Sequence, residues 1–219
     1  MDSQEKEYTQ TTTTSQVSIW EVGTRILSVF SSPFLIPLLS FVMLFNFTYL
    51  EIMPLPYQVF VLGIVCTFTI IVPWLFIYIY KKINHWQMKE LSKRKKRFIP
   101  YVLTLLSYLT CFLTMYKLHL PRYFSSIIVA VFICILICFL LNLRWRISIH
   151  LAGCGLLIGG LLSYSWLFLF NPIWWLCGLI LLFGFQGTAR IIYCQHSLLE
   201  VIVGFIVGMF CGIIGILFI

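Results

Sequence analysis

Three ionisable residues stand near the start of the last apolar stretch of the sequence, where charged side chains are costly. Arg190, His196 and Glu200 are separated by five and three residues, and Glu200 is the sole acidic residue after Glu90. On a helix, His196 and Glu200 share a face because they are four residues apart. Ionisable groups in membrane segments are usually functional, so we interpret the three as a candidate site for chemistry on an anion. The alternative is an interfacial Arg and His with a Glu that bonds a neighbour.

A second polar cluster precedes another apolar stretch. It contains Arg144, Arg146, Ser148 and His150. A helix that begins near Ser148 would offer free backbone amides and a positive dipole end to an anion. Ordinary interface chemistry, with Arg and Trp flanking a span, explains this cluster equally well.

The third cluster is a basic segment between two apolar stretches. Lys93 to Arg97 is an unbroken cationic run, and attraction to anionic lipids accounts for most of it. Arg97 is best placed to reach the candidate site, because it directly precedes the next span. Lys89 is a weaker candidate for the same role.

Small residues in the apolar stretches predict how these clusters are positioned. Gly204, Gly208 and Gly212 form a ridge at four-residue spacing, and Gly155 and Gly159 form another. Such ridges let membrane helices pack closely. We therefore expect the polar side chains at their ends to point into protein.

The composition identifies an integral membrane protein. The 219 residues are 61% hydrophobic and 10% charged, and the mean hydropathy is +0.99. Long uncharged apolar runs of about 20 residues indicate membrane-spanning helices. The fold class is therefore all-α, a polytopic bundle of six to seven transmembrane helices. The expected spans are 33–50, 57–80, 98–117, 123–142, 148–169, 172–189 and 197–219.

The chain divides into three parts. Residues 1–16 are rich in Thr, Ser, Gln and charge and predict a disordered tail. Residues 17–32 mix apolar and charged residues and predict an interfacial helix. Residues 33–219 form a single membrane domain. The tail has no basic start or small-residue cleavage site, so we expect no removable signal peptide.

Cysteine spacing and charge exclude several classes of function. Eight cysteines are scattered without a C-x-x-C pair, which argues against a zinc site and a disulfide framework. The net charge of +8 fits loops beside anionic lipid and anion-binding residues better than nucleic-acid binding.

The positions of the basic residues predict the orientation. If every span crosses, all of the 15 Lys and Arg residues except Lys117 and Arg122 lie on the face that carries the three clusters. The positive-inside rule places this face in the cytoplasm. We expect a multi-pass protein of a bacterial inner membrane.

The clusters together resemble the type 2 phosphatidic-acid phosphatase superfamily of membrane lipid phosphatases. Its third signature, Ser-Arg-x5-His-x3-Asp, has the spacing of Arg190, His196 and Glu200. Here Ala189 replaces the Ser and Glu200 replaces the Asp. Gly204 follows, as the family's glycine does.

The other two signatures are matched in part. Ser148-Ile-His150 is similar to Pro-Ser-Gly-His without its Pro and Gly. Arg97-Phe-Ile-Pro100 has two extra residues compared with the family's Arg-Pro, and Lys89 lies one residue too far from Arg97. Two spans separate these motifs where the family has a loop.

The resemblance implies a mechanism. His196 would attack phosphorus to form a phosphohistidine, with Glu200 orienting its imidazole, and His150 would protonate the leaving group. Arg190, Ser148, Arg97 and Lys89 would bind the phosphoryl oxygens. No cofactor is implied, and Glu200 alone cannot assemble a Mg²⁺ cage.

The expected substrate is a lipid phosphate or pyrophosphate, such as undecaprenyl pyrophosphate, phosphatidylglycerol phosphate or phosphatidic acid. The family usually works on the outer face, which conflicts with the charge count. A catalytically inactive membrane scaffold or lipid-binding protein is the first alternative, and the decayed motifs favour it. A transporter is the second, although no inverted repeat is evident. A phosphotransferase with an acceptor other than water is a close variant.

Overall fold

The computed structural model describes residues 32, 34–47, 49–83, 98–145, 147–192 and 197–217. Every element in these ranges is helical. In chain order they are α2 (Ile36–Phe47), the 3₁₀ helix η1 (Tyr49–Ile52), α3 (Leu55–Cys66), the π-helical turn η2 (Thr67–Ile71), α4 (Val72–Ile83), α5 (Phe98–Lys117), α6 (Arg122–Asn142), α7 (Ile149–Phe168), α8 (Ile173–Ile192) and α9 (Leu198–Leu217). The predicted tail 1–16 and almost all of the predicted interfacial helix 17–32 lie outside these residues.

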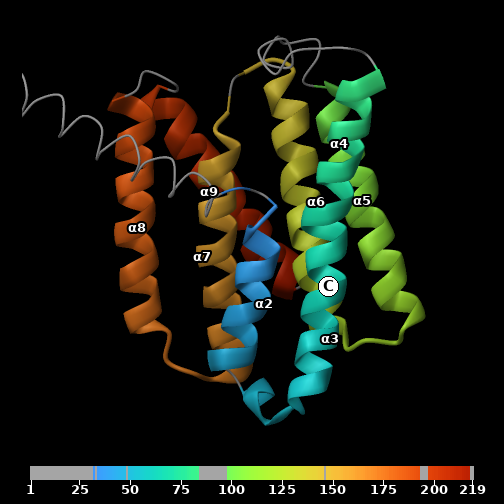
Figure 1. Ribbon diagram of the computed structural model, residues 1–219. Helices are drawn as coiled ribbons and strands as arrows, with labels where there is room; N and C mark the ends of the chain where they lie inside the picture. The colour runs from blue at the N-terminus through green and yellow to red at the C-terminus, as the bar shows by residue number, and fades with distance from the viewer. Residues whose placement is uncertain are drawn as a thin grey trace, which may run out of the picture.

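Among the described residues, five helices are long and apolar enough to cross a membrane. They are Leu55–Tyr80, Arg122–Asn142, Ile149–Phe168, Ile173–Ile192 and Leu198–Leu217. The chain is therefore a multi-pass membrane protein, as its composition predicts. α5 has 20 residues and runs beside α6 (Figure 1). The count of six to seven spans stays a prediction.

The helix ends follow from local sequence. α3 and α6 begin directly after Pro54 and Pro121, where the missing proline N–H breaks no helical hydrogen bond. α7 ends at Phe168, because the next residue, Leu169, has a left-handed φ of 53° that stops helical propagation. The predicted boundaries are confirmed to within a few residues, except that α2 is shorter than 33–50 and α8 extends past Arg190 to Ile192.

α3, η2 and α4 form one continuous helical run with a bulge in its middle. Pro73 cannot donate a hydrogen bond to the carbonyl four residues before it, and the π-helical turn immediately precedes it. The Ser107 hydroxyl of α5 donates a hydrogen bond to the carbonyl oxygen of Phe68. The irregular backbone is thus satisfied by a neighbouring helix, as the membrane interior requires.

The centre of the bundle is α7, and its closest partner is α9. Most of α7 is buried, whereas most of α8 is exposed. The contact of α7 with α9 is the most extensive between any two of the described elements, followed by that of α6 with α9. α8 stands at the edge of the bundle and contacts chiefly α7 (Figure 1).

Glycines hold the α7–α9 contact together. A Cβ at Gly208 would overlap the carbonyl oxygen of Ala152, and one at Gly155 would overlap that of Phe205. Gly159 and Gly212 likewise face the backbone of the opposite helix. The predicted small-residue ridges are therefore confirmed, and each ridge is packed against the other helix.

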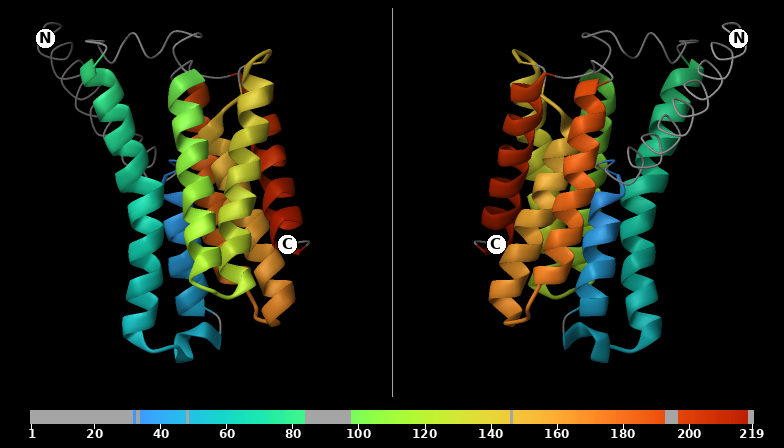
Figure 2. Two further views of the ribbon diagram at one scale, coloured as in Figure 1. Left: turned by 90° about the vertical axis from the view of Figure 1, so that its right-hand side faces the viewer. Right: turned by 90° about the vertical axis from the view of Figure 1, so that its left-hand side faces the viewer.

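The two ends of the bundle differ in charge. The ends of α4, α6 and α8 and the starts of α5, α7 and α9 all lie at one end of the bundle (Figure 1, Figure 2). Lys82, Arg144 and Arg190 belong to this end, and Lys117 and Arg122 belong to the opposite one. The predicted convergence of the polar clusters on one side is confirmed for these described residues.

Substitution of Gly208 by Ala is expected to destabilise the bundle by about 1–3 kcal/mol, because α7 and α9 must separate to admit the methyl group. Thermal unfolding of purified protein in detergent measures this effect. The matched control is Gly178→Ala on α8, where a Cβ meets nothing within 4 Å and the helix propensity of Ala is favourable. Equal unfolding temperatures for the two variants would contradict the role of Gly208.

Candidate functional site

The N-terminus of α7 lies against the first turns of α9. The backbone N–H of Ser148 donates a hydrogen bond of 3.5 Å to the carbonyl oxygen of Glu200. The Ser148 carbonyl oxygen lies 2.7 Å from where a Cβ on Gly204 would stand. Glycine at this position therefore allows the contact, and two of the polar clusters predicted from sequence are brought together.

The Ser148 hydroxyl is a buried polar group with unused hydrogen-bonding capacity. Ser148 is the N-cap of α7 with an extended backbone (φ −79°, ψ 104°), but its hydroxyl does not cap the helix. The side chain is fully buried, and its Oγ has no hydrogen-bond partner within the described part of the chain. An unsatisfied buried hydroxyl costs about 1–3 kcal/mol. Its place at a helix N-terminus, where the backbone amides and the dipole attract negative charge, suits it to an anionic ligand.

Glu200 has a structural role at the start of α9. The backbone N–H of Ser197 donates to Glu200 Oε2 at 3.2 Å, and the N–H of Glu200 donates to Ser197 Oγ at 3.4 Å. This reciprocal pair is a capping box. It also places a carboxylate at the positive end of the helix dipole, so Glu200 stabilises α9 whatever else it does.

Arg190 reaches the same end of the bundle from α8. It lies in the last turn of that helix, where a cation is favoured by the dipole, and its side chain is half-buried. The guanidinium lies near the Cys154 side chain of α7. Since Cys154 is one turn along α7 from His150, both residues lie on the side of α7 that Arg190 approaches.

Packing below the polar groups fixes the three helices relative to one another. A Cβ at Gly187 of α8 would lie 3.5 Å from the Val201 side chain of α9 and 3.8 Å from that of Leu151 of α7. Leu151 follows His150 and Val201 follows Glu200 in the sequence. The apolar contact thus ties α8 to the helices that carry these two residues.

An apolar groove of about 330 Å³ lies between α7, α8 and α9. Thr188 is the one polar side chain among the lining residues described, and its hydroxyl already donates to the Gly184 carbonyl oxygen. Gly187, Leu151 and Val201 line the groove at the end where the polar groups gather. Its chemistry suits a hydrocarbon chain rather than a polar ligand.

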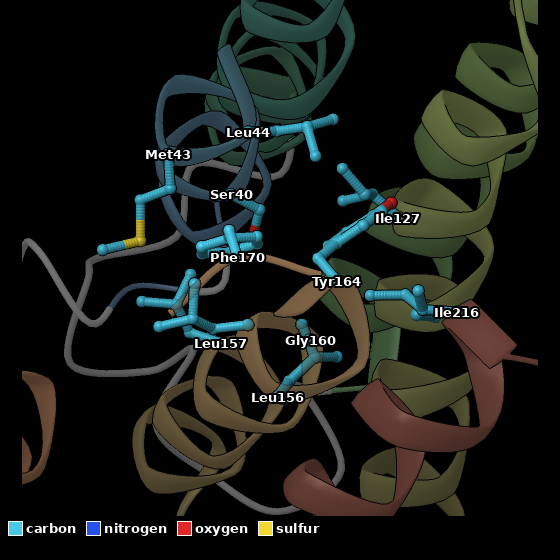
Figure 3. A pocket seen from close by; sticks show the side chains of 12 residues that line it. Ser40, Met43, Leu44, Ile127, Leu156, Leu157, Gly160, Tyr164, Phe170 and Ile216 are labelled. Carbon is cyan, nitrogen blue, oxygen red and sulfur yellow. The ribbon is translucent and has the colours of Figure 1, made fainter. Parts of the chain in front are cut away.

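A smaller cavity lies in the interior, between α2, α6, α7 and α9 (Figure 3). Its volume of about 20 Å³ is close to the minimum for one water molecule. The Tyr164 hydroxyl at its edge donates to the Tyr123 carbonyl oxygen at 2.6 Å, and the Ser40 hydroxyl donates to that of Ile36 at 2.9 Å. The cavity therefore has no polar group directed at a ligand, and we do not assign it a function.

Several predicted site residues lie outside the described residues. These are His196, Arg97 and Lys89, together with Arg146. α9 begins at Leu198, and the prediction that His196 and Glu200 share one helical face involves a residue outside the described ones. Of the predicted site, Ser148, His150, Arg190 and Glu200 are described, and all lie at one end of three adjacent helices.

No protein-family model, no curated protein and no solved structure matches this chain. The resemblance to the lipid phosphatases therefore stays a prediction that rests on its motifs.

Two features of the site were missed in the sequence. The pattern Ser197-x-x-Glu200 before an apolar run is the signature of a capping box and could have been recognised. The groove had no such signal, because it arises from the distance between α8 and its neighbours.

The capping box predicts how Glu200 variants behave. Glu200→Ala and Ser197→Ala should each lower the free energy of unfolding by about 1 kcal/mol, and the double variant should lose little more, since both act in one cap. Glu200→Gln should retain stability, because Gln also completes a capping box. Thermal unfolding in detergent measures all four. Unchanged stability in both single Ala variants would rule out the cap.

Proposed function

We propose that this protein is a metal-independent phosphohydrolase that acts on a lipid-linked phosphate or pyrophosphate through a phosphohistidine intermediate. The observation that carries the proposal is the buried, unsatisfied hydroxyl of Ser148 at the N-terminus of α7. It lies where the helices with Arg190 and Glu200 converge. A phosphoryl group supplies the oxygen acceptors that such a position lacks.

The phosphoryl group binds at the positive end of α7. The Ser148 hydroxyl and the first amides of the helix donate to its oxygens, and the Arg190 guanidinium contributes charge from α8. Arg97 and Lys89 complete the binding set, as the resemblance implies. These donors also stabilise the negative charge that spreads over the oxygens in the transition state.

The reaction proceeds in two steps. His196 attacks phosphorus, the bond to the leaving oxygen breaks, and His150 gives that oxygen a proton. Water then attacks the phosphohistidine, the P–N bond breaks and phosphate is released. His150 takes the proton of this water and is ready for the next turnover.

Glu200 combines capping with orientation of the nucleophile. A carboxylate has two oxygens and about four acceptor positions, so Glu200 can accept hydrogen bonds from both Ser197 and the His196 imidazole. The capping box also holds the carboxylate in one position. A fixed carboxylate selects the imidazole tautomer that presents a lone pair to phosphorus.

The substrate class follows from the groove. A hydrocarbon chain in the space between α7, α8 and α9 would place its headgroup near Ser148 and Arg190. Acyl and polyprenyl chains both fit this chemistry, so undecaprenyl pyrophosphate, phosphatidylglycerol phosphate and phosphatidic acid all remain candidates. By the positive-inside rule the headgroup lies on the cytoplasmic side of a bacterial inner membrane.

The second candidate is an inactive phosphatase-like scaffold or lipid-binding protein. The capping box favours it, because it explains Glu200 without catalysis. The groove is equally compatible with lipid binding alone. The two candidates differ in one measurable property, the release of phosphate.

Phosphate release from lipid phosphates and pyrophosphates in detergent, with EDTA present, tests the proposal. Wild type should release phosphate and His196→Ala should not, because the nucleophile is absent. Ser148→Ala should lose roughly a hundredfold in rate through one missing donor, yet stay as stable as wild type because it removes an unsatisfied hydroxyl.

The matched control is Ser163→Ala. Ser163 is also a buried serine of α7, but its hydroxyl is satisfied by the Gly159 carbonyl oxygen at 2.9 Å, so its removal should leave the rate unchanged. If folded wild type releases no phosphate from any lipid, the scaffold candidate replaces the phosphatase.

Filling the groove is expected to affect long-chain substrates selectively. Gly184 lines the groove, and a Cβ there meets nothing within 4 Å. Gly184→Leu should raise KM for a long-chain lipid phosphate roughly tenfold and leave a short-chain analogue nearly unchanged. Gly178→Leu, one and a half turns away on α8 and outside the groove lining, is the control. Equal effects on both chain lengths would mean that the groove does not hold the chain.

A further inference from the structure

Three buried thiols meet where α6 packs against α9. Cys134 and Cys138 belong to α6 and Cys211 to α9, and their exposed fractions are 4%, 0% and 6%. None of them has a part in the proposed phosphatase site. The phosphatase proposal therefore does not explain why these three thiols lie near one another.

The register of the two helices places Cys134 opposite Cys211. α6 and α9 are antiparallel, since α6 ends and α9 begins at the same end of the bundle (Figure 1). A Cβ at Gly215 would lie 2.8 Å from the Ala130 Cα, so the backbones are in contact at this level. Cys134 follows Ala130 by four residues on α6, and Cys211 precedes Gly215 by four residues on α9. Because the helices are antiparallel, both steps lead about one helical turn in the same direction along the bundle.

Side-chain contacts agree with this register. The side chains of Cys134 and Cys211 are near enough to interact, and Cys138 lies one helical turn from Cys134 on its own helix. A cavity of about 10 Å³ beside Cys134 and Cys138 leaves room for a small shift of the sulfur atoms.

A metal site does not account for the three thiols. Within the described parts of the chain, no group of three or more His, Cys, Asp or Glu side chains is arranged to hold a metal ion. A disulfide instead requires close Cα atoms with side chains that face each other, and Cys134 and Cys211 each stand one helical turn from the backbone contact of Ala130 with Gly215.

We propose that Cys134 and Cys211 form a reversible disulfide that ties α6 to α9 when a membrane-permeant oxidant is present. With diamide, one thiol adds across the N=N bond and the second sulfur then displaces this adduct. One S–S bond forms, both S–H bonds break, and the two protons and two electrons reside on the hydrazine product. A dithiol reductant reverses the reaction.

The cross-link acts on the helix that carries the Glu200 cap. α9 is held to α7 by glycine contacts and to α6 by the contact at Gly215. A covalent tie to α6 restricts the separation of α9 from the bundle and thereby raises its resistance to unfolding. The proposal does not depend on the phosphatase activity.

The test is oxidation of the folded full-length protein with diamide, followed by denaturation and alkylation of the remaining thiols. The chain has eight cysteines, so wild type should fall from eight alkylated thiols to six. Peptide mapping should find Cys134 joined to Cys211, and the oxidised protein should unfold at a higher temperature until it is reduced.

Single cysteine-to-serine variants identify which two thiols form the disulfide. Cys134→Ser and Cys211→Ser should each retain all seven of their remaining thiols after diamide. Cys138→Ser and the exposed α8 control Cys177→Ser should each still lose two. A wild type that keeps eight alkylated thiols, or a mapped cross-link between any other pair, would overturn the proposal. Mapping of wild type decides the matter even if a serine variant fails to fold.

Discussion

Close backbone contact between α7 and α9 is the constraint on which the rest of the structure depends. Lipid surrounds this protein, so burial of apolar side chains gives little drive for its helices to associate, and dispersion contacts between well-fitted surfaces must supply it. Gly155 and Gly208 allow carbonyl oxygens of the opposite helix to occupy the space of a side chain. The same fit fixes the register of the two helices. It therefore also determines which groups meet at their ends.

The polar end of the bundle is a consequence of that register. With α7 and α9 in close contact, the N-terminus of α7 packs directly on the first turns of α9 at Gly204. The Ser148 amide is satisfied by the Glu200 carbonyl oxygen, while the Ser148 hydroxyl is buried without a partner in the described chain. Two helix N-termini lie side by side here, and their dipoles attract negative charge. The Glu200 carboxylate balances part of this positive potential, and we propose that a phosphoryl group balances the remainder.

α8 packs more loosely than the α7–α9 pair. α8 is mostly exposed and contacts chiefly α7, yet it carries Arg190 into the polar end. A rigid pair of helices beside a more loosely held one leaves an apolar groove that opens toward the same polar groups. α9 also packs on α6, where Cys134 and Cys211 lie one turn beyond the glycine contact. α9 is thus the element that links the candidate site, the groove and the thiols.

The sequence by itself determined the elements and much of their arrangement. Apolar runs of membrane-crossing length, prolines at helix starts and four-residue glycine spacing each reflect local physics. They predicted the helices, the convergence of their polar ends and the close packing of the two helices that carry glycine ridges. Only the tertiary structure decided the rest. The unsatisfied state of Ser148, the groove beside Gly184 and the pairing of Cys134 with Cys211 depend on the distances and register between helices distant in sequence. No spacing within one segment encodes these quantities, because they result from the packing of all the helices together.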